Sequence, residues 1–233
     1  MRRTRPLLAG CALAFAALGS SAQMLPPPQN VLQLQASGTV EVQQDLLTLR
    51  LTTARDGAEP AAVQSQLKAA LEAALAQARH TAQPGLMDVR TGNFALYPRH
   101  NREGRITGWT GSTELVLEGR DFERITQAAA RIQTLTLGGT SFGLSREQRA
   151  KVEDEAQALA IGRFQAKATE LARGFGFGSY TLREVAVNAS EPGYLPRPRM
   201  AAMEAKAVAD SPVPVEPGKS EVTVTVSGSV QLR

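Results

Sequence analysis

Apolar residues are concentrated in two short segments near the start of the chain. The first covers residues 31–42, and the second, residues 47–52, alternates leucines with polar residues. A period of two is typical of a strand with one buried face. We therefore expect two strands here, with Gln43-Gln44-Asp45 as the turn between them.

A helical pattern follows between Pro60 and His80. Apolar residues recur there at spacings of three and four positions, and they are Val63, Leu67, Ala70, Leu71, Ala74, Leu75 and Ala78. Proline suits the first turn of a helix, where its missing N–H is not needed. The spacing therefore predicts an amphipathic helix that ends near His80.

The same order then repeats along the chain. Residues 87–98 and 108–117 are predicted to be a second pair of strands. Asp121 is a plausible N-cap for a short helix, whose apolar face would hold Ile125, Ala128, Ala129 and Ile132. Residues 31–134 thus resemble two ββα units in their order, and a short strand at 140–144 follows.

The strongest helical pattern begins after Ser145. Ser145 is an expected N-cap, and Gln148 holds the capping-box position. The apolar stripe that follows consists of Val152, Ala156, Leu159, Ala160, Phe164, Ala168, Leu171, Ala172 and Phe175. We expect a helix of roughly 28 residues, about 42 Å long, that ends at Gly174.

The end of the chain is predicted to add two strands, at 180–187 and 221–232. Residues 189–219 between them contain six prolines and many charges, so they predict a long exposed loop, either functional or disordered. The expected fold class is therefore α+β, with two ββα-type units plus a long C-terminal helix and closing strands.

The first 22 residues have the features of a secretory signal peptide. Three arginines near Met1 precede the apolar run 6–18, and small residues lead to Ala22. Cleavage after Ala22 would leave a Pro-rich segment at 23–30 and a domain at 31–233. The mature protein is therefore expected to be exported to an oxidising compartment.

The same segment partly matches two other export signals. Leu8-Ala9-Gly10-Cys11 matches a lipoprotein pattern, which would place a lipidated cysteine at the mature N-terminus. The apolar run continues past Cys11, however, which favours a signal peptide without lipid. The pair Arg2-Arg3 suggests twin-arginine export, but Arg5 and Pro6 replace its hydrophobic pair.

Charge and composition exclude several function classes. The chain has 233 residues, with 42% hydrophobic, 21% charged and 5% aromatic, which is ordinary globular composition. Its formal charge of +4 depends on the first 22 residues, because removing their three arginines leaves 23 of 26 basic residues against 22 acidic ones. We therefore expect no nucleic-acid partner. Cys11, the only cysteine, would also leave with the signal peptide, so the mature chain would have no disulfide or thiol chemistry.

Residues that carry chemistry are sparse. His80 and His100 are the only histidines, and neither lies in a metal-binding spacing. No GxSxG sequence is present, and the glycines at 174–178 follow a helix, which favours a helix cap over a phosphate loop. We expect no catalytic, cofactor-binding or metal-binding residue.

One local cluster stands out. Arg99, His100, Arg102 and Arg105 form a basic segment between Tyr97 and Trp109, at the predicted tip of a hairpin. A solvated hairpin is the simplest interpretation, and contact with anionic lipid, lipopolysaccharide or a partner's acidic residues is the alternative. A second alternative is a small-ligand pocket or an unrecognised hydrolase site near Tyr97, His100 and Trp109.

Three stretches resemble the SIMPL-domain family. Residues 88–98 followed by 106–109 are similar to its "dI.T....l.P" and "i.GY" motifs, and residues 36–45 to its opening "v.G.g.v...PD". Residues 142–145 and the alanine-rich helix after them are similar to "f.lsd" and "A...A..kA..lA..lG". The resemblance covers nearly all of residues 31–232, with Gln44 replacing the usual proline and Trp109 replacing the commoner tyrosine.

The resemblance implies an α+β fold and a periplasmic or outer-membrane-associated location. It also implies relatives that include periplasmic immunogenic proteins, ring-like oligomers and a member linked to oxidative-stress protection. The family has no established catalytic residues. We therefore expect an exported, non-enzymatic envelope protein that acts by self-assembly, or by binding an envelope protein or outer-membrane partner, in envelope or oxidative-stress protection.

Overall fold

The computed structural model describes residues 29–190 and 214–233. The predicted signal peptide, Cys11 and most of the predicted Pro-rich loop lie outside these residues. The elements, in chain order, are β1 (Val31–Gln43), β2 (Leu46–Gly57), α1 (Pro60–Thr81), β3 (Asp88–His100), β4 (Ile106–Gly119), α2 (Phe122–Arg131), β5 (Thr136–Gly143), α3 (Arg146–Gly174), β6 (Tyr180–Ser190) and β7 (Lys219–Leu232). The α+β fold class and the order of the elements are confirmed.

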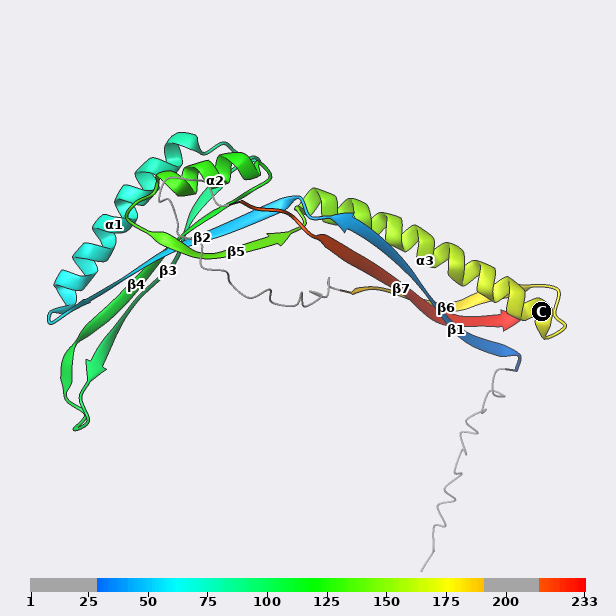
Figure 1. Cartoon of the computed structure of the whole chain (residues 1–233). Coiled ribbons are helices and arrows are strands. Elements are labelled where there is room, and N and C mark those ends of the chain that lie inside the picture. The colour runs from blue at the N-terminus through cyan, green and yellow to red at the C-terminus, as the bar shows by residue number, and fades with distance from the viewer. Residues whose placement is uncertain (1–28, 191–213) are drawn as a thin grey trace, which may run out of the picture.

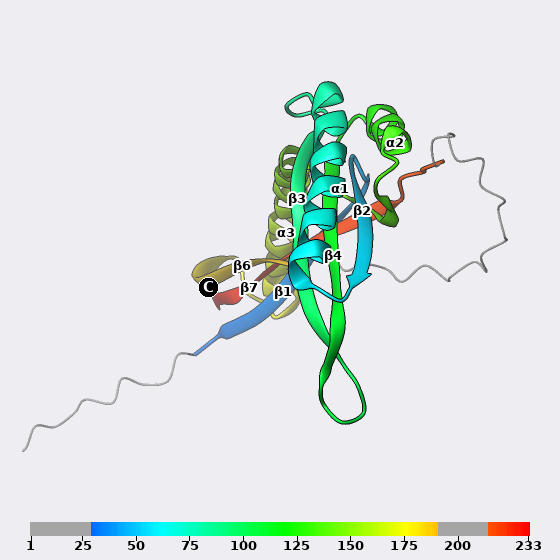
Figure 2. The same cartoon turned by 90° about the vertical axis from the view of Figure 1, so that its left-hand side faces the viewer.

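The strands form two antiparallel sheets. One has three strands in the order β1-β7-β6, and the other has four in the order β3-β4-β2-β5. Helix α3 covers one face of the three-stranded sheet, and α1 and α2 cover one face of the four-stranded sheet (Figure 1). The two layers lie end to end, with the helices on the same side, and Figure 2 looks along the molecule from the four-stranded end.

The predicted turn between β1 and β2 is wrong. The two strands do not pair, because β1 joins β7 in one sheet and β2 joins β4 and β5 in the other. Gln44 N–H donates to the Gly218 carbonyl (2.9 Å), whereas Asp45 N–H donates to the Gly143 carbonyl (3.1 Å), so consecutive residues bond to different layers. Alternation of apolar residues indicates a half-buried strand but not its partner, which explains the error.

The core of the four-stranded layer follows the predicted pattern. Its buried leucines alternate along β2 and β4 and face the helices, and they are Leu47, Leu49, Leu51, Leu115 and Leu117. Ala74 and Ala78 of α1 and Ile125 of α2 are fully buried against them. Val215, which precedes β7, also packs on this core.

Small residues bring α3 close to the three-stranded sheet. The buried side of α3 repeats every four positions, with Val152, Ala156, Ala160, Phe164, Ala168 and Ala172. Ala156, Ala160 and their neighbours pack on valines of β7 and on Leu34 of β1. Because most of these α3 residues are alanines, the helix backbone lies near the strands.

The start of α3 is capped as predicted, with one difference. The Ser145 hydroxyl oxygen accepts a hydrogen bond from the Gln148 N–H (3.2 Å). In a capping box the side chain at the Gln148 position would accept from the Ser145 N–H. Instead, Ser145 N–H donates to the Asp45 carboxylate (2.7 Å), which comes from the crossing between β1 and β2.

Asp121 caps α2, as predicted, and this contact predicts a pH effect. Its carboxylate accepts from Arg124 N–H (3.0 Å) and from the Arg124 side chain (3.1 Å). These bonds hold the pKa of Asp121 below its usual value of 3.8. A lowered folded-state pKa stabilises the fold above the unfolded-state pKa, and the stabilisation disappears as pH falls through the folded-state pKa.

Asp121→Ala is therefore expected to lower the free energy of unfolding by about 1 kcal/mol at pH 7. The difference from the wild type should shrink once the pH falls below 3.8. Urea unfolding of both proteins across a pH series measures it. A difference that stays constant down to the lowest pH would mean that the carboxylate charge has no part in the cap.

Candidate functional site

The two histidines are exposed and lie on different elements. His80 is exposed near the end of α1, and His100 is exposed at the end of β3. In residues 29–190 and 214–233, no group of three or more His, Cys, Asp or Glu side chains could hold a metal ion. The expectation of no metal or catalytic residue therefore stays a prediction for the whole chain.

The two aromatic side chains of the alternative pocket, Tyr97 and Trp109, lie on opposite faces of their hairpin. In the hairpin of β3 and β4, Tyr97 lies opposite Thr110, whereas Trp109 lies opposite Pro98. Neighbouring positions of a strand point to opposite faces, so the Tyr97 and Trp109 side chains lie on different sides of the hairpin. Tyr97 and Trp109 are therefore near each other in the hairpin, but their side chains do not face a common pocket.

The glycine-rich stretch after α3 is a helix end, as the sequence indicates. Phe175 N–H donates to the Leu171 carbonyl (3.0 Å), and Phe177 N–H donates to the Ala172 carbonyl (2.9 Å). These bonds satisfy the last carbonyls of α3. The N–H groups of Phe175 and Phe177 therefore bond to carbonyls of α3 and are not directed at a ligand.

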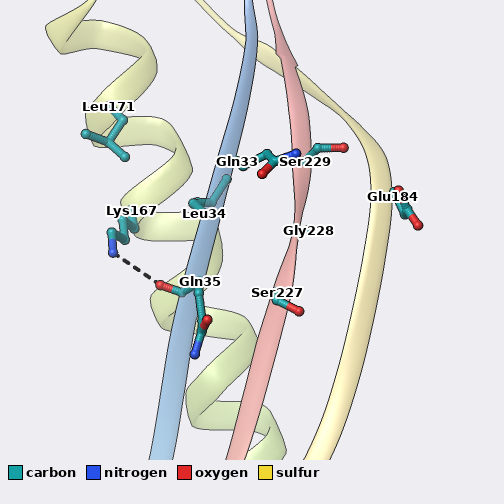
Figure 3. Close-up of a pocket in the computed structure, with 9 residues that line it drawn as sticks. All are labelled: Gln33, Leu34, Gln35, Lys167, Leu171, Glu184, Ser227, Gly228 and Ser229. Atoms are coloured by element: carbon teal, nitrogen blue, oxygen red, sulfur yellow. Dashed lines mark hydrogen bonds between the residues drawn. The ribbon is translucent and has the colours of Figure 1, made fainter.

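An open depression crosses the edge of the three-stranded sheet (Figure 3), and its volume is about 560 Å³. Its lining residues come from α3 and all three strands, and are Gln33, Leu34, Gln35, Lys167, Leu171, Glu184, Ser227, Gly228 and Ser229. Lys167 Nζ donates to the Gln35 carbonyl (3.2 Å), and Glu184 lies on the far side of the strands and points away from it. The charged groups do not converge on one point, as they do in a small-molecule site.

Hydroxyl and amide groups cover the sheet face opposite α3. The hydroxyl oxygens of Ser37 and Thr225 lie 3.0 Å apart, and those of Thr39 and Thr223 also lie 3.0 Å apart. Both histidines belong to the four-stranded layer, so neither can act as a base for these hydroxyls. On this face, these hydroxyls therefore hydrogen-bond to each other across β1 and β7.

Strand β6 carries the first surface of interest. Leu182, Val185 and Val187 have exposed fractions of 57%, 44% and 45%. Leu182 lies opposite Val230 and Val187 opposite Val226, so they are on the α3 side of the sheet, but α3 packs mainly on β1 and β7. We call these three side chains and the outer edge of β6, which pairs with no strand in residues 29–190 and 214–233, the β6 surface.

The second surface is the hairpin tip, which we define as residues 99–107. Every residue of the tip except Asn101 is exposed, including the predicted basic cluster. Arg99 forms an ion pair with Asp56 of β2 (3.8 Å). The sequence therefore located the basic cluster correctly at the end of a hairpin.

A model of one protein family matches residues 32–230, and its description reads SIMPL, protein of unknown function (DUF541). The chain belongs to the SIMPL family. A comparison with curated proteins gave no match. The match spans both sheets and all three helices of the SIMPL chain, so both surfaces belong to the family domain.

Two SIMPL motif positions have structural roles here. Gln44, where the family usually has proline, uses its side chain to accept from Gly218 N–H (3.1 Å) and to donate to Ser220 (3.0 Å). Asp45 accepts from the Ser145 hydroxyl (2.6 Å) and pairs with Arg120 (3.4 Å). These contacts fix the crossing between the two layers.

A further charged contact joins the ends of β1 and β7. Lys219 donates a hydrogen bond to the Glu41 carboxylate, which raises the pKa of Lys219. The pair is exposed, and it stabilises strand pairing at most weakly. It lies outside both surfaces.

Proposed function

We propose that this SIMPL protein is an exported, non-enzymatic protein of the cell envelope that acts by associating with further copies of itself. Its first 22 residues support export, since a basic start, an apolar run and small residues occur in the order of a signal peptide. In the described part of the chain, no helix is long and apolar enough to cross a membrane.

The observation that carries the association is the state of the sheet edges. A free edge offers unpaired N–H and C=O groups to another strand, and proteins usually block such edges with charges, prolines or bulges. The edge of β1 is blocked, because Arg163 donates to the Ser37 carbonyl (2.7 Å) and Lys167 to the Gln35 carbonyl (3.2 Å). Both cations come from α3, which lies beside this edge (Figure 3).

The edges of the other sheet are also protected. Strand β3 has Pro98, charged residues and two irregularities in its pairing with β4. Strand β5 is short, contains three glycines and has a register shift opposite Arg50 and Leu51. Both features hinder the addition of a strand.

Strand β6 differs from these edges. Residues 185–189, Val-Ala-Val-Asn-Ala, contain neither charge nor proline and are exposed throughout. Pairing of β6 with β6 of a second copy would join two three-stranded sheets into one of six strands. It would also cover Leu182, Val185 and Val187, whose burial drives association.

The test uses the protein without its predicted signal peptide in sedimentation equilibrium. The wild type is expected to associate reversibly with rising concentration. Val185→Lys places a charge in the proposed interface and should weaken association by at least about tenfold, because an unpaired charge is costly to bury. Val185 is 44% exposed, so the monomer fold should keep its melting temperature.

Leu137→Lys is the matched control. Leu137 lies on the β5 edge and is 42% exposed, so the substitution adds the same charge at an equally open apolar position of the other sheet. It should leave association unchanged. A wild type that stays monomeric at high concentration, or equal effects of the two lysines, would overturn the proposal.

A further inference from the structure

The hairpin tip extends beyond the rest of its sheet. Strand β2 ends its pairing with β4 at Gly57, which lies opposite Trp109. Past that point β3 and β4 have only each other, and they project freely to the turn (Figures 1 and 2). A two-stranded projection of this kind cannot surround a ligand, but its end can touch a broad surface.

The turn at the end of the hairpin has a defined shape. Asn101 N–H donates to the Arg105 carbonyl (2.9 Å), which closes a three-residue loop. The Asn101 side-chain oxygen accepts from Glu103 N–H (3.1 Å) and from Arg105 N–H (2.9 Å). Gly104 has a φ of +77°, which glycine adopts without strain at this position of a hairpin loop. Arg102 and Arg105 are therefore presented on an ordered loop.

The positive charge of the hairpin tip is local and only partly neutralised. It carries Arg99, Arg102 and Arg105 against the single acidic residue Glu103. Among the described residues, Arg102 and Arg105 form no salt bridge, whereas Arg99 has Asp56. The protein without its first 22 residues is nearly neutral, so an anionic partner would be attracted by this tip rather than by the whole molecule.

Exposed apolar groups lie beside these arginines. Ile106 is 55% exposed within the tip, and Tyr97 is 60% exposed at its base, opposite Thr110, where β2 still pairs with β4. Tyrosine is enriched at membrane interfaces, where its ring contacts acyl chains and its hydroxyl remains hydrated. Basic residues next to apolar ones are the combination that binds anionic bilayers.

We propose that the hairpin tip docks on the surface of an anionic lipid bilayer. Arg102 and Arg105 bind lipid phosphates, for which the guanidinium group offers paired donors. Ile106 enters the interfacial layer beside them, and Tyr97 lies farther from the bilayer at the base of the tip. An acidic protein would satisfy the arginines equally well, but it would not explain the exposed Ile106 at the end of a free projection.

The experiment measures binding of the protein without its predicted signal peptide to sedimented vesicles. Vesicles of 70% phosphatidylcholine and 30% phosphatidylglycerol (about the anionic content of many bilayers) are compared with vesicles of phosphatidylcholine alone. Binding should be specific for the anionic vesicles and should fall as salt is raised. Equal binding to both vesicles would overturn the proposal, because it would show that the lipid charge has no part in docking. Binding to neither would overturn it in favour of an acidic protein partner.

The double variant Arg102→Gln with Arg105→Gln should bind anionic vesicles at least about tenfold more weakly, since each basic residue near such a surface contributes several-fold. Arg146→Gln with Lys151→Gln is the control, because it removes the same charge from two exposed positions of α3. The control should bind like the wild type. Equal losses in the two double variants would show that only net charge matters and would refute the role of the tip.

Two further variants separate the apolar contact of the tip from its charge, and vesicle binding from self-association. Ile106→Ser should weaken binding by about fivefold, through lost apolar contact, and leave its salt dependence unchanged. Val185→Lys, which tests association through the β6 surface, should leave the binding of the monomer to vesicles intact. The two proposals can thus fail independently.

Discussion

Replacing Gly38 with alanine is expected to lower the free energy of unfolding by about 3 kcal/mol. Gly38 lies in the middle of β1 and is buried under α3. A Cβ atom at this position would lie 2.1 Å from the Ala156 carbonyl oxygen and 2.7 Å from the Ala160 nitrogen. Both are backbone atoms, so no side-chain rotation can make room, and α3 would have to move away from the sheet.

The size of this effect follows from how α3 is packed. Its contact face consists largely of alanines, which bury well only while the helix remains near β1 and β7. A shift of α3 would therefore loosen its whole contact with Val224 and Val226 rather than one residue. Urea unfolding, followed by circular dichroism, measures the loss.

The same substitution at Gly162 is the control, and it should have the opposite sign. Gly162 is an exposed position inside α3, and a Cβ atom there meets nothing within 4 Å. Alanine favours a helix interior over glycine, so Gly162→Ala should raise the free energy of unfolding by about 0.5–1 kcal/mol. Equal effects at the two glycines would show that α3 is not held at Gly38.

The contrast between these glycines shows what the sequence could predict. Helix α3 was predicted with its N-cap at Ser145 and its end at Gly174, because spacing and capping are local properties. Helices α1 and α2 were predicted for the same reason. The contact of Gly38 with Ala156 joins residues far apart in the chain, and no local sequence pattern predicts it.

The prediction that β1 and β2 belong to one sheet was wrong for a related reason. Strands β1 and β2 are neighbours in sequence, but β1 pairs with β7, whose partner residues lie about two hundred positions away. The roles of Gln44 and Asp45 could not be predicted either, because their partners belong to distant segments. Gln44 bonds to Gly218, and Asp45 bonds to Gly143 and Ser145. Those bonds replace the tight turn that sequence proximity suggested.

The candidate surfaces also differ in whether a local sequence pattern predicts them. The basic hairpin tip was predictable, because its charges follow one another within a single turn. The sequence also placed Tyr97 and Trp109 at one pocket, but the register puts their side chains on opposite faces of the hairpin, and a difference of one position decides the face. Which strand edge is open could not be predicted, because in the described residues it depends on the position of α3, which packs on β1 and β7 more than on β6.

Replacing Asp45 with alanine is the second substitution with a large expected effect. The Asp45 carboxylate accepts from the Ser145 N–H (2.7 Å) and hydroxyl (2.6 Å) and lies 3.4 Å from Arg120. Its side chain is 23% exposed, so lost bonds are only partly replaced by water. Hydrogen bonds to a charged group contribute more than neutral ones, so Asp45→Ala should lower the free energy of unfolding by about 2–3 kcal/mol.

Asp45 also connects the two layers, so its loss should act on α3 in particular. The Ser145 hydroxyl caps α3 through Gln148 N–H (3.2 Å), and Asp45 orients that hydroxyl. Hydrogen exchange should therefore accelerate in the first turn of α3 more than in α1 or α2. Asp45→Ala and Ser145→Ala should be non-additive when combined, because both remove the same bonds.

Asp56→Ala is the matched control for Asp45→Ala. Asp56 is also paired with an arginine, Arg99 (3.8 Å), but its side chain is 62% exposed and the pair is in solvent. Such pairs contribute little, so this substitution should change the free energy of unfolding by less than about 1 kcal/mol. Similar losses for Asp45→Ala and Asp56→Ala would contradict the role of Asp45, since the larger effect is expected only from a carboxylate that binds the N-cap of α3 across the two layers.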